Sequence, residues 1–298
     1  MIDLHMCSDM SSSGKYSMTE VLTRAETAGV KVLSITDHNT ALSNLLMDNM
    51  DVTKFFSGKI ITGIEIDACY KGLTFEVMAY GFNPYKVQEW AYDRFGNVEF
   101  RQKLIMKKLQ EKCKKCGFTF DEDYEWDVRT EFAHHNMYHN LMQYPDNEDR
   151  FNYTITDESD FYRNTTSNPD FNLSIDMSFL WPKIREVVDV IHSAHGKVFL
   201  ARPCAYRQEI DVDTLLDIAR KNKVDGIEVF VPTHTREHIE KLITYAKKHK
   251  MLVSGGSMYT GNRGSDKFAV LDTSNEYLQH TLKVLDKYGY KKPIKKKA

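Results

Sequence analysis

The chain has 298 residues, of which 42% are hydrophobic and 28% charged, and its formal net charge is −2. This composition is typical of a globular protein with a substantial core, and the small net charge gives no overall case for binding nucleic acid or a membrane surface. No apolar run approaches the roughly 20 residues that span a bilayer. The five cysteines are sparse and odd in number, unlike a disulfide framework. We therefore expect a cytoplasmic protein with no nucleic-acid and no membrane partner.

The first 80 residues alternate short apolar runs with amphipathic stretches. The predicted strands cover residues 31–36, 59–66 and 73–80. A helix whose apolar positions include Val21, Leu22 and Ala25 precedes the first of them. Strands that alternate with helices in this way favour a parallel α/β arrangement.

Residues 98–117 predict a long amphipathic helix, with basic residues away from its apolar stripe. Residues 118–180 then lose the alternation and are rich in Asp, Asn, Tyr and Phe, with several turn signals. Alternation resumes at Trp181, and strands are predicted over residues 198–201, 226–231 and 251–254. We interpret residues 98–180 as a helical insertion and residues 1–97 with 181–298 as the main α/β domain. The strongly basic tail, residues 291–297, is interpreted as a solvated terminus.

Several polar residues follow predicted strands, where the functional residues of parallel α/β barrels lie. They are His5, Asp37, His38, Glu65, Arg202, Thr233 and Ser257. His5 and Cys7 are two residues apart on a strand, so their side chains face the same way and could bind one ion. His134, His135 and His139 of the insertion are interpreted as surface or stacking residues.

Six ordered blocks of the sequence resemble the PHP (polymerase and histidinol phosphatase) family. They are residues 3–5, 25–40, 63–66, 191–198, 225–229 and 252–257. The resemblance implies a distorted (β/α)7 TIM-like PHP barrel with a helical insertion. It also implies hydrolysis of a phosphoester with up to three divalent ions, which activate water. One branch of the family carries such an insertion and hydrolyses phosphate from nucleotides.

The site implied by the resemblance is only partly retained. The metal ligands it implies are His5, Cys7, Asp37, Glu65, Glu76 and Glu131, with His38 and Arg202 as catalytic residues. The residues that depart from the family pattern are Cys7, Glu76, Glu131 and Arg202, each where a His is usual, and Met258 and Thr260, where the closing Asp and His are usual.

These departures have different chemical consequences. Cys7 keeps a ligand for zinc but makes it softer. Glu65, Glu76 and Glu131 would repel one another unless a cation, a proton or an arginine intervenes. Arg202 is either that partner or a group that binds phosphate. The thioether of Met258 and the hydroxyl of Thr260 do not replace an anionic or imidazole ligand. We therefore expect at most one divalent ion, which could be zinc, manganese or magnesium.

Two functions remain open from the sequence. The first is a phosphoesterase of weak or altered activity on a nucleotide or another small phosphate ester. The second is a non-catalytic PHP homologue that binds a phosphorylated ligand or serves as a scaffold. A small phosphorylated molecule is the expected partner in the first case, and the oligomeric state is left open. The insertion is expected to cap the mouth of the barrel, with Glu131 pointing into it.

Overall fold

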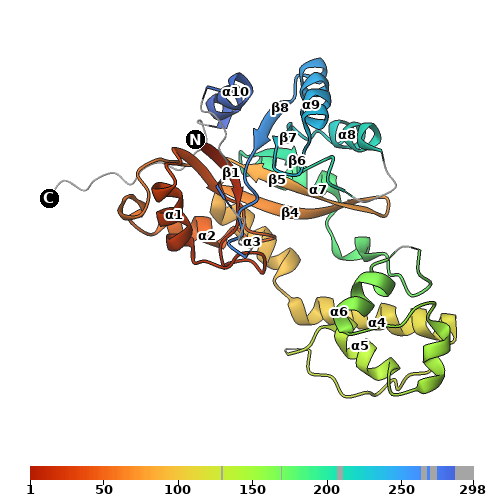
Figure 1. Cartoon of the computed structure of the whole chain (residues 1–298). Helices are drawn as coiled ribbons and strands as arrows, with labels where there is room; N and C mark the ends of the chain where they lie inside the picture. The colour runs from red at the N-terminus through yellow and green to blue at the C-terminus, as the bar shows by residue number, and fades with distance from the viewer. Residues whose placement is uncertain (129, 169, 207–210, 263–266, 269–273, 286–298) are drawn as a thin grey trace. The chain divides into compact units, whose positions relative to one another are not determined.

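The computed structural model describes the chain except for residues 129, 169, 207–210, 263–266, 269–273 and 286–298 (Figure 1). The basic tail therefore lies outside the described residues. The chain divides into two compact units, a main unit of Met1–Phe95 with Trp181–Ala298 and an insertion unit of Gly96–Leu180. Within the described part of the chain, no helix is both long and apolar enough to cross a membrane.

A three-stranded parallel sheet opens the main unit. Its strands, in spatial order, are β1 (Ile2–Met6), β2 (Val32–Ile35) and β3 (Lys59–Ile60). Helix α1 (Met18–Thr27) starts at a capping box, in which Ser17 and Glu20 exchange side-chain and backbone hydrogen bonds. Its apolar side packs on the sheet, as the periodicity of Val21, Leu22 and Ala25 predicts.

A five-stranded sheet makes up the rest of the strand layer. Its strands, in spatial order, are β4 (Gly63–Tyr70), β5 (Leu73–Tyr80), β6 (Lys197–Leu200), β7 (Gly226–Phe230) and β8 (Leu252–Gly255). The pairs β4–β5 and β5–β6 are antiparallel, whereas β6, β7 and β8 run parallel. The strands β4 and β5 form a hairpin because Lys71 and Gly72 both have positive φ, at 48° and 87°, as a tight two-residue turn requires. The prediction of parallel strands is wrong for this hairpin.

Among the described residues, the strand pairing does not close the two sheets into the barrel that the resemblance implies. The predicted strand over residues 59–66 is broken into β3 and β4. Asn44, in helix α2 (Leu42–Asp48), donates from Nδ2 to the Gly63 carbonyl at 2.8 Å and accepts from the Gly63 N–H at 3.1 Å. Its amide thus takes the backbone groups that pairing with β2 would need. Isolated bridges connect the sheets at His38–Glu65 and Met6–Tyr259.

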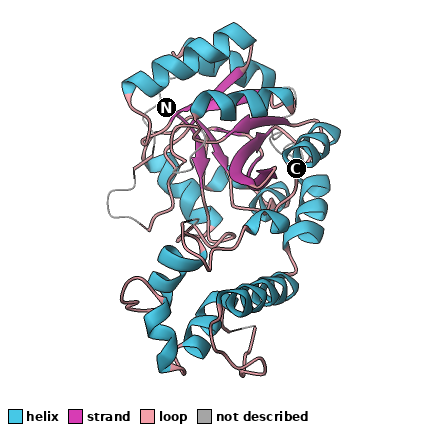
Figure 2. Cartoon of the chain, turned by 90° about the vertical axis from the view of Figure 1, so that its right-hand side faces the viewer, coloured by secondary structure: helices cyan, strands magenta, loops and turns pink. Residues whose placement is uncertain are grey.

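Apolar residues lie on both sides of the five-stranded sheet. Outside it pack four helices, α3 (Pro84–Phe95), α7 (Ile184–Ser193), α8 (Val212–Lys221) and α9 (Arg236–His249). Inside, Leu4 of β1 and Met78 and Phe199 of the larger sheet share one core, which helix α10 (Glu276–Leu285) completes. Figure 2 shows the strands of the main unit surrounded by helices. The sheets therefore face a common interior, and polar residues at its open end are close together.

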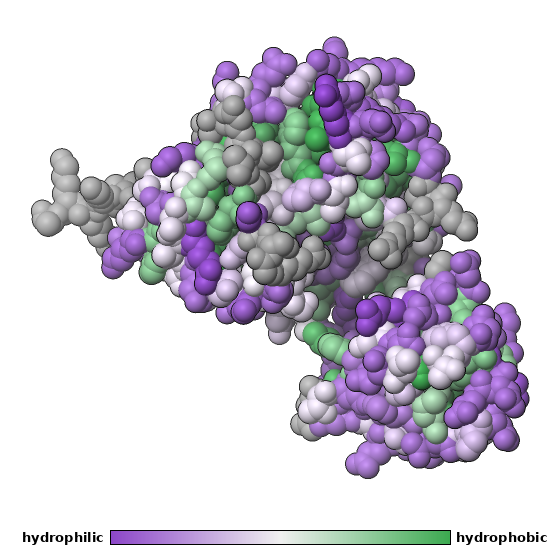
Figure 3. All heavy atoms as spheres, viewed as in Figure 1, coloured by the Kyte–Doolittle hydropathy of each residue, from purple (hydrophilic) through white to green (hydrophobic). Residues whose placement is uncertain are grey.

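The insertion unit is helical around its own small core. Its α-helices are α4 (Val98–Cys116), α5 (Ala133–Leu141) and α6 (Glu158–Phe161). Its shorter helical elements are η2 (Pro145–Arg150), η3 (Tyr162–Thr166) and η4 (Met177–Leu180). The predicted helix over residues 98–117 is confirmed as α4. Ile105, Leu109 and Cys113 are buried on one side of it, and Figure 3 shows mainly hydrophilic residues on the visible face of this unit. The short element η1 (Val52–Lys54) belongs to the main unit.

Candidate metal centre

The centre of the site is a buried histidine between two carboxylates. His5, on β1, points Nδ1 at Glu228 Oε1 (2.8 Å) and Nε2 at Glu65 Oε2 (3.3 Å). All three side chains are at most 2% exposed. Burial alone would lower the pKa of His5, but the two carboxylates outweigh burial and raise it to about 10. His5 is thus held as a cation that fixes the position of Glu65.

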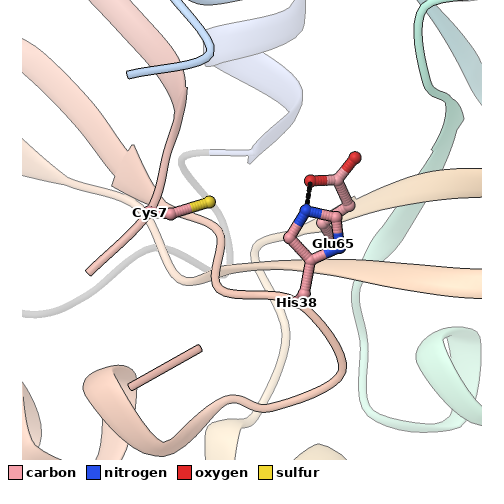
Figure 4. Close-up of side chains that lie close together, drawn as sticks. All are labelled: Cys7, His38 and Glu65. Carbon is pink, nitrogen blue, oxygen red and sulfur yellow. Dashed lines mark ion pairs between the residues drawn. The ribbon is translucent and has the colours of Figure 1, made fainter. Parts of the chain in front are cut away.

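Cys7, His38 and Glu65 form the one group of possible metal ligands found among the described residues. A ligand atom from each lies within 4.8 Å of the others, and Figure 4 shows the Cys7 thiol directed toward the His38–Glu65 pair. His38 Nε2 is 2.8 Å from Glu65 Oε2. These residues follow β1, follow β2 and lie in β4, so strand ends that are distant in sequence build the group.

The Glu65 carboxylate is buried without full hydrogen bonding. Both of its oxygens are inaccessible to solvent, and neither accepts a well-directed hydrogen bond from a described residue. Nitrogen atoms of His5, His38 and Arg202 nevertheless lie 2.8 to 3.3 Å from these oxygens. The three side chains therefore act on Glu65 mainly through their charge. Burial raises the pKa of Glu65, yet the charges of His5 and His38 lower it well below its usual range. A buried anion with unused lone pairs is suited to a cation.

The group fits one divalent ion. A thiolate, an imidazole and a carboxylate are the ligand types of zinc sites that keep a fourth position open. Burial raises the pKa of the Cys7 thiol, and Glu65 and Asp37 raise it further. The thiolate therefore needs a nearby cation to form, as a bound metal ion would provide. His5 is not a member of this group, and its two ring nitrogens lie close to Glu228 and Glu65.

Arg202 bridges two of the carboxylates. Its Nη2 lies 2.9 Å from Glu65 Oε1 and 3.0 Å from Glu76 Oε2, while its backbone N–H donates to Glu228 Oε2 at 3.1 Å. Two roles were expected for Arg202, and in the structure it is the partner of the carboxylates of Glu65 and Glu76. Its role in binding phosphate stays a prediction, which the other guanidinium nitrogens would have to fulfil.

Asp37 is buried but serves the neighbouring loop. Its carboxylate accepts hydrogen bonds from the Ser8 N–H (2.6 Å), the Ser8 hydroxyl (2.8 Å) and the Ser11 hydroxyl (3.4 Å). It is not a member of the group of possible ligands. Serines of the loop after β1 thus use the carboxylate that the resemblance had assigned to a metal. Its role as a ligand stays a prediction.

Glu131 belongs to the insertion unit, where Asn136 Nδ2 donates to its Oε2 at 2.9 Å and His139 Nε2 lies 3.8 Å from its Oε1. Its predicted role as a ligand, and the predicted capping by the insertion, stay predictions. Nearby, His134 is buried and packs edge-on against Tyr162, in line with its interpretation as a stacking residue.

Two acidic residues of the site were not singled out from the sequence. Glu228 is an isolated acid in the apolar strand β7, a pattern that marks a buried polar group with a specific partner. Asp67 is two residues after Glu65 on β4 and is paired in register with Glu76 of β5. Period-two alternation could have indicated that Glu65 and Asp67 share a face. Asn39 Nδ2 donates to Asp67 Oδ2 at 2.5 Å.

Unusual backbone conformations surround the site. Asn39, Arg202 and Met258 have positive φ angles of 58°, 40° and 57°, and they follow the strands β2, β6 and β8. Such conformations are costly for residues other than glycine and tend to collect at functional sites. Gly256 is also constrained, because a Cβ there would lie 2.3 Å from the His5 nitrogen. Three of the strand ends around the site therefore have strained backbone conformations.

Known proteins share this fold. One similar structure is that of an amidohydrolase from Chromobacterium violaceum, solved with bound sulfate and no metal. The match covers 95% of this chain and 96% of the amidohydrolase, with a TM-score of 0.64 and 17% identity. The chain also matches a candidate metal-dependent phosphoesterase from Bifidobacterium adolescentis over 95% and 96% of the two chains, with a TM-score of 0.60 and 21% identity. The mixed α/β fold is thus one that proteins described as hydrolases also have.

A sequence relative is a 5′-3′ exoribonuclease of Haemophilus influenzae, 24% identical over 264 residues, which are 86% of this chain and 88% of the relative. No family model matches the chain. The similarity therefore extends over most of both proteins, at low identity.

Proposed function

We propose that the chain is a divergent PHP-family phosphoesterase that uses one divalent ion, held by Cys7, His38 and Glu65, and hydrolyses a small phosphate ester slowly. The observation that carries the proposal is the convergence of a thiol, an imidazole and the buried Glu65 carboxylate, whose ligand atoms lie within 4.8 Å of one another. The printed names of two similar proteins, a candidate phosphoesterase and an exoribonuclease, also concern phosphoester chemistry.

The distorted seven-stranded barrel is part of the same proposal. The isolated bridges His38–Glu65 and Met6–Tyr259 support it, because they join the two sheets on both sides of a shared interior. We also propose a small phosphorylated molecule as the ligand and the cytoplasm as the location, on the sequence argument above. The sulfate bound in the similar amidohydrolase is a tetrahedral anion, like phosphate.

Within this proposal each residue of the site has a distinct role. A bound ion would polarise the phosphoryl group and lower the pKa of a water molecule. Glu65 and Cys7 supply buried anionic ligands, and His38, whose side chain is 26% exposed, supplies a ligand on the open side. His5 orients Glu65 through Nε2, and Glu228 fixes the His5 ring through Nδ1.

Metal analysis combined with a substrate screen tests the proposal. We expect about one zinc or manganese ion per chain after equilibration and desalting, lost in His38→Ala. Slow, metal-dependent release of phosphate from mononucleotides or p-nitrophenyl phosphate should accompany it. A 5′-phosphorylated RNA oligonucleotide belongs in the screen because of the relative. Two or three ions per chain, or efficient turnover of a simple ester that His38→Ala abolishes and added metal restores in the unmutated protein, would contradict the proposal.

The second candidate is a non-catalytic homologue that binds a phosphorylated ligand or acts as a scaffold. It is favoured by Met258 and Thr260, which supply no strong ligand, and by the engagement of Arg202 with Glu65 and Glu76. Calorimetric binding of a mononucleotide without any phosphate release at saturating metal would support this candidate over the first.

A further inference from the structure

A guanidinium stands where two acidic side chains of the site meet. Arg202 Nη2 contacts both Glu65 Oε1 and Glu76 Oε2, at 2.9 and 3.0 Å. The side chain of Arg202 is 15% exposed and that of Glu65 is fully buried. A carboxylate pair this close, with one member out of water, requires a positive charge.

The contact is held in place on both sides. The Ala201 N–H donates to the Glu76 carbonyl, and the Glu76 N–H donates to the Tyr206 hydroxyl, which in turn donates to the Ala201 carbonyl. The Arg202 backbone has φ of 40° and donates to Glu228. These bonds tie the backbone around Arg202 to the strand of Glu76, so the side chain starts from a fixed position beside Glu65 and Glu76.

Arginine is suited to a permanent role of this kind. Its guanidinium does not deprotonate in proteins and presents several donors to carboxylates. Burial lowers the pKa of Arg202, but Glu65 and Glu76 outweigh burial and raise it. Unlike a metal ion, the guanidinium cannot be removed by a chelator, because it is part of the chain.

We propose that Arg202 is a fixed cation that occupies the space between Glu65 and Glu76, and that it thereby prevents a second divalent ion from binding next to the Cys7–His38–Glu65 ion. This inference rests on the function proposed above and deepens it. Arg202 acts here as a positioning residue, since it sets the charge and the conformation of Glu65. Glu65 is then left with Oε2 facing His38, on the side of the proposed ion.

The number of bound ions tests the inference directly. After equilibration with manganese and desalting, Arg202→Met should bind about one more ion per chain than the unmutated protein, because Glu65 and Glu76 become free to share it. The double variant Arg202→Met with Glu76→Gln should lose this additional ion. Arg202→Lys keeps a positive charge and should not gain one. Arg236→Met, at an arginine whose side chain is 91% exposed, is the matched control.

The readout is the difference between variant and unmutated protein, so it is separate from the proposed function. If the unmutated protein binds no ion, the proposed function fails, whereas a gain of one ion in Arg202→Met that Glu76→Gln removes still supports the inference that Arg202 occupies an ion site between Glu65 and Glu76. An equal ion count in Arg202→Met and the unmutated protein would overturn it, as would a gain that survives Glu76→Gln. If Arg202→Met does not fold, judged by circular dichroism, Arg202→Gln is measured in its place with the same expected gain.

Discussion

Asn44 pairs with both backbone groups of Gly63, donating to its carbonyl and accepting from its N–H. Both residues are fully buried or nearly so, and a Cβ at Gly63 would lie 2.0 Å from the Ser34 hydroxyl oxygen. The chain thus passes close to β2 at this point without pairing with it. The contact determines where β4 begins and, two residues further on, where Glu65 lies.

Asn44→Ala should lower the free energy of unfolding by about 2 to 4 kcal/mol, since two buried backbone groups lose their partners. Urea denaturation measures the loss. The matched control is Asn49→Ala at the C-cap of the same helix, where the exposed amide donates to the Leu45 carbonyl and to the Tyr85 hydroxyl. That change should cost less than about 1 kcal/mol. Equal losses in the two variants would contradict the role assigned to Asn44.

Glu228→Ala should also be destabilising, by about 3 kcal/mol, because the buried His5 loses one of its two carboxylate partners and the Arg202 N–H loses its acceptor. Thermal and urea unfolding measure the change. Glu240→Ala, at an exposed i, i+4 ion pair with Arg236, is the control and should cost less than about 0.5 kcal/mol. A mild effect of Glu228→Ala would show that His5 is not held as a cation.

The pH dependence of the insertion unit follows from His134. Burial lowers its pKa to about 4, and neither ring nitrogen has a hydrogen-bond partner among the described residues. The neutral ring is therefore favoured when the unit is folded. Its contribution is complete above pH 6.5, the ordinary pKa of histidine, and is lost as the pH falls from 6.5 toward 4. The loss should reach about 3 kcal/mol.

Hydrogen exchange across α5 at pH 7 and pH 4.5 measures this dependence. Because intrinsic amide exchange is slower at the lower pH, the rates are compared as protection factors; we expect these to fall at pH 4.5 in the unmutated protein and to change much less in His134→Leu, which has no proton to bind. An equal fall of the protection factors in both proteins would show that other groups are responsible.

Much of the site could be predicted from the position of residues at strand ends. His5, His38 and Glu65 were selected in this way, and Cys7 by its spacing of two residues from His5; the structure brings the four together because the β strands converge. The rule works since backbone pairing, which depends on short-range pattern, determines where each strand stops. The rule does not reveal which acidic residue at a strand end will accept hydrogen bonds from a loop and so be unavailable as a metal ligand. Asp37 binds loop serines through contacts that no periodicity encodes.

The antiparallel hairpin was missed for a different reason. Residues 59–66 contain four isoleucines, which predict a buried strand but not its partner or direction. The Lys71-Gly72 turn was the available signal, because a short turn with glycine favours a hairpin. The break at Gly63 depends on Asn44, 19 residues earlier, and such a contact is visible only in three dimensions.

The last prediction concerns the choice of metal. A thiolate favours zinc over manganese, whereas imidazole and carboxylate discriminate less. Cys7→Ser keeps the size of the side chain but replaces the soft ligand, so it should weaken zinc binding by at least about tenfold, equivalent to about 1.4 kcal/mol. Manganese binding should change by a smaller factor.

Competition with a chromophoric chelator measures both affinities at one pH. Cys69→Ser, at a buried thiol that donates to the Trp181 carbonyl outside the ligand group, is the control and should leave both unchanged. If Cys7→Ser weakens zinc and manganese binding equally, the predicted zinc preference of the thiolate is wrong. If Cys7→Ser changes neither affinity while His38→Ala abolishes both, Cys7 only fills space beside the ion.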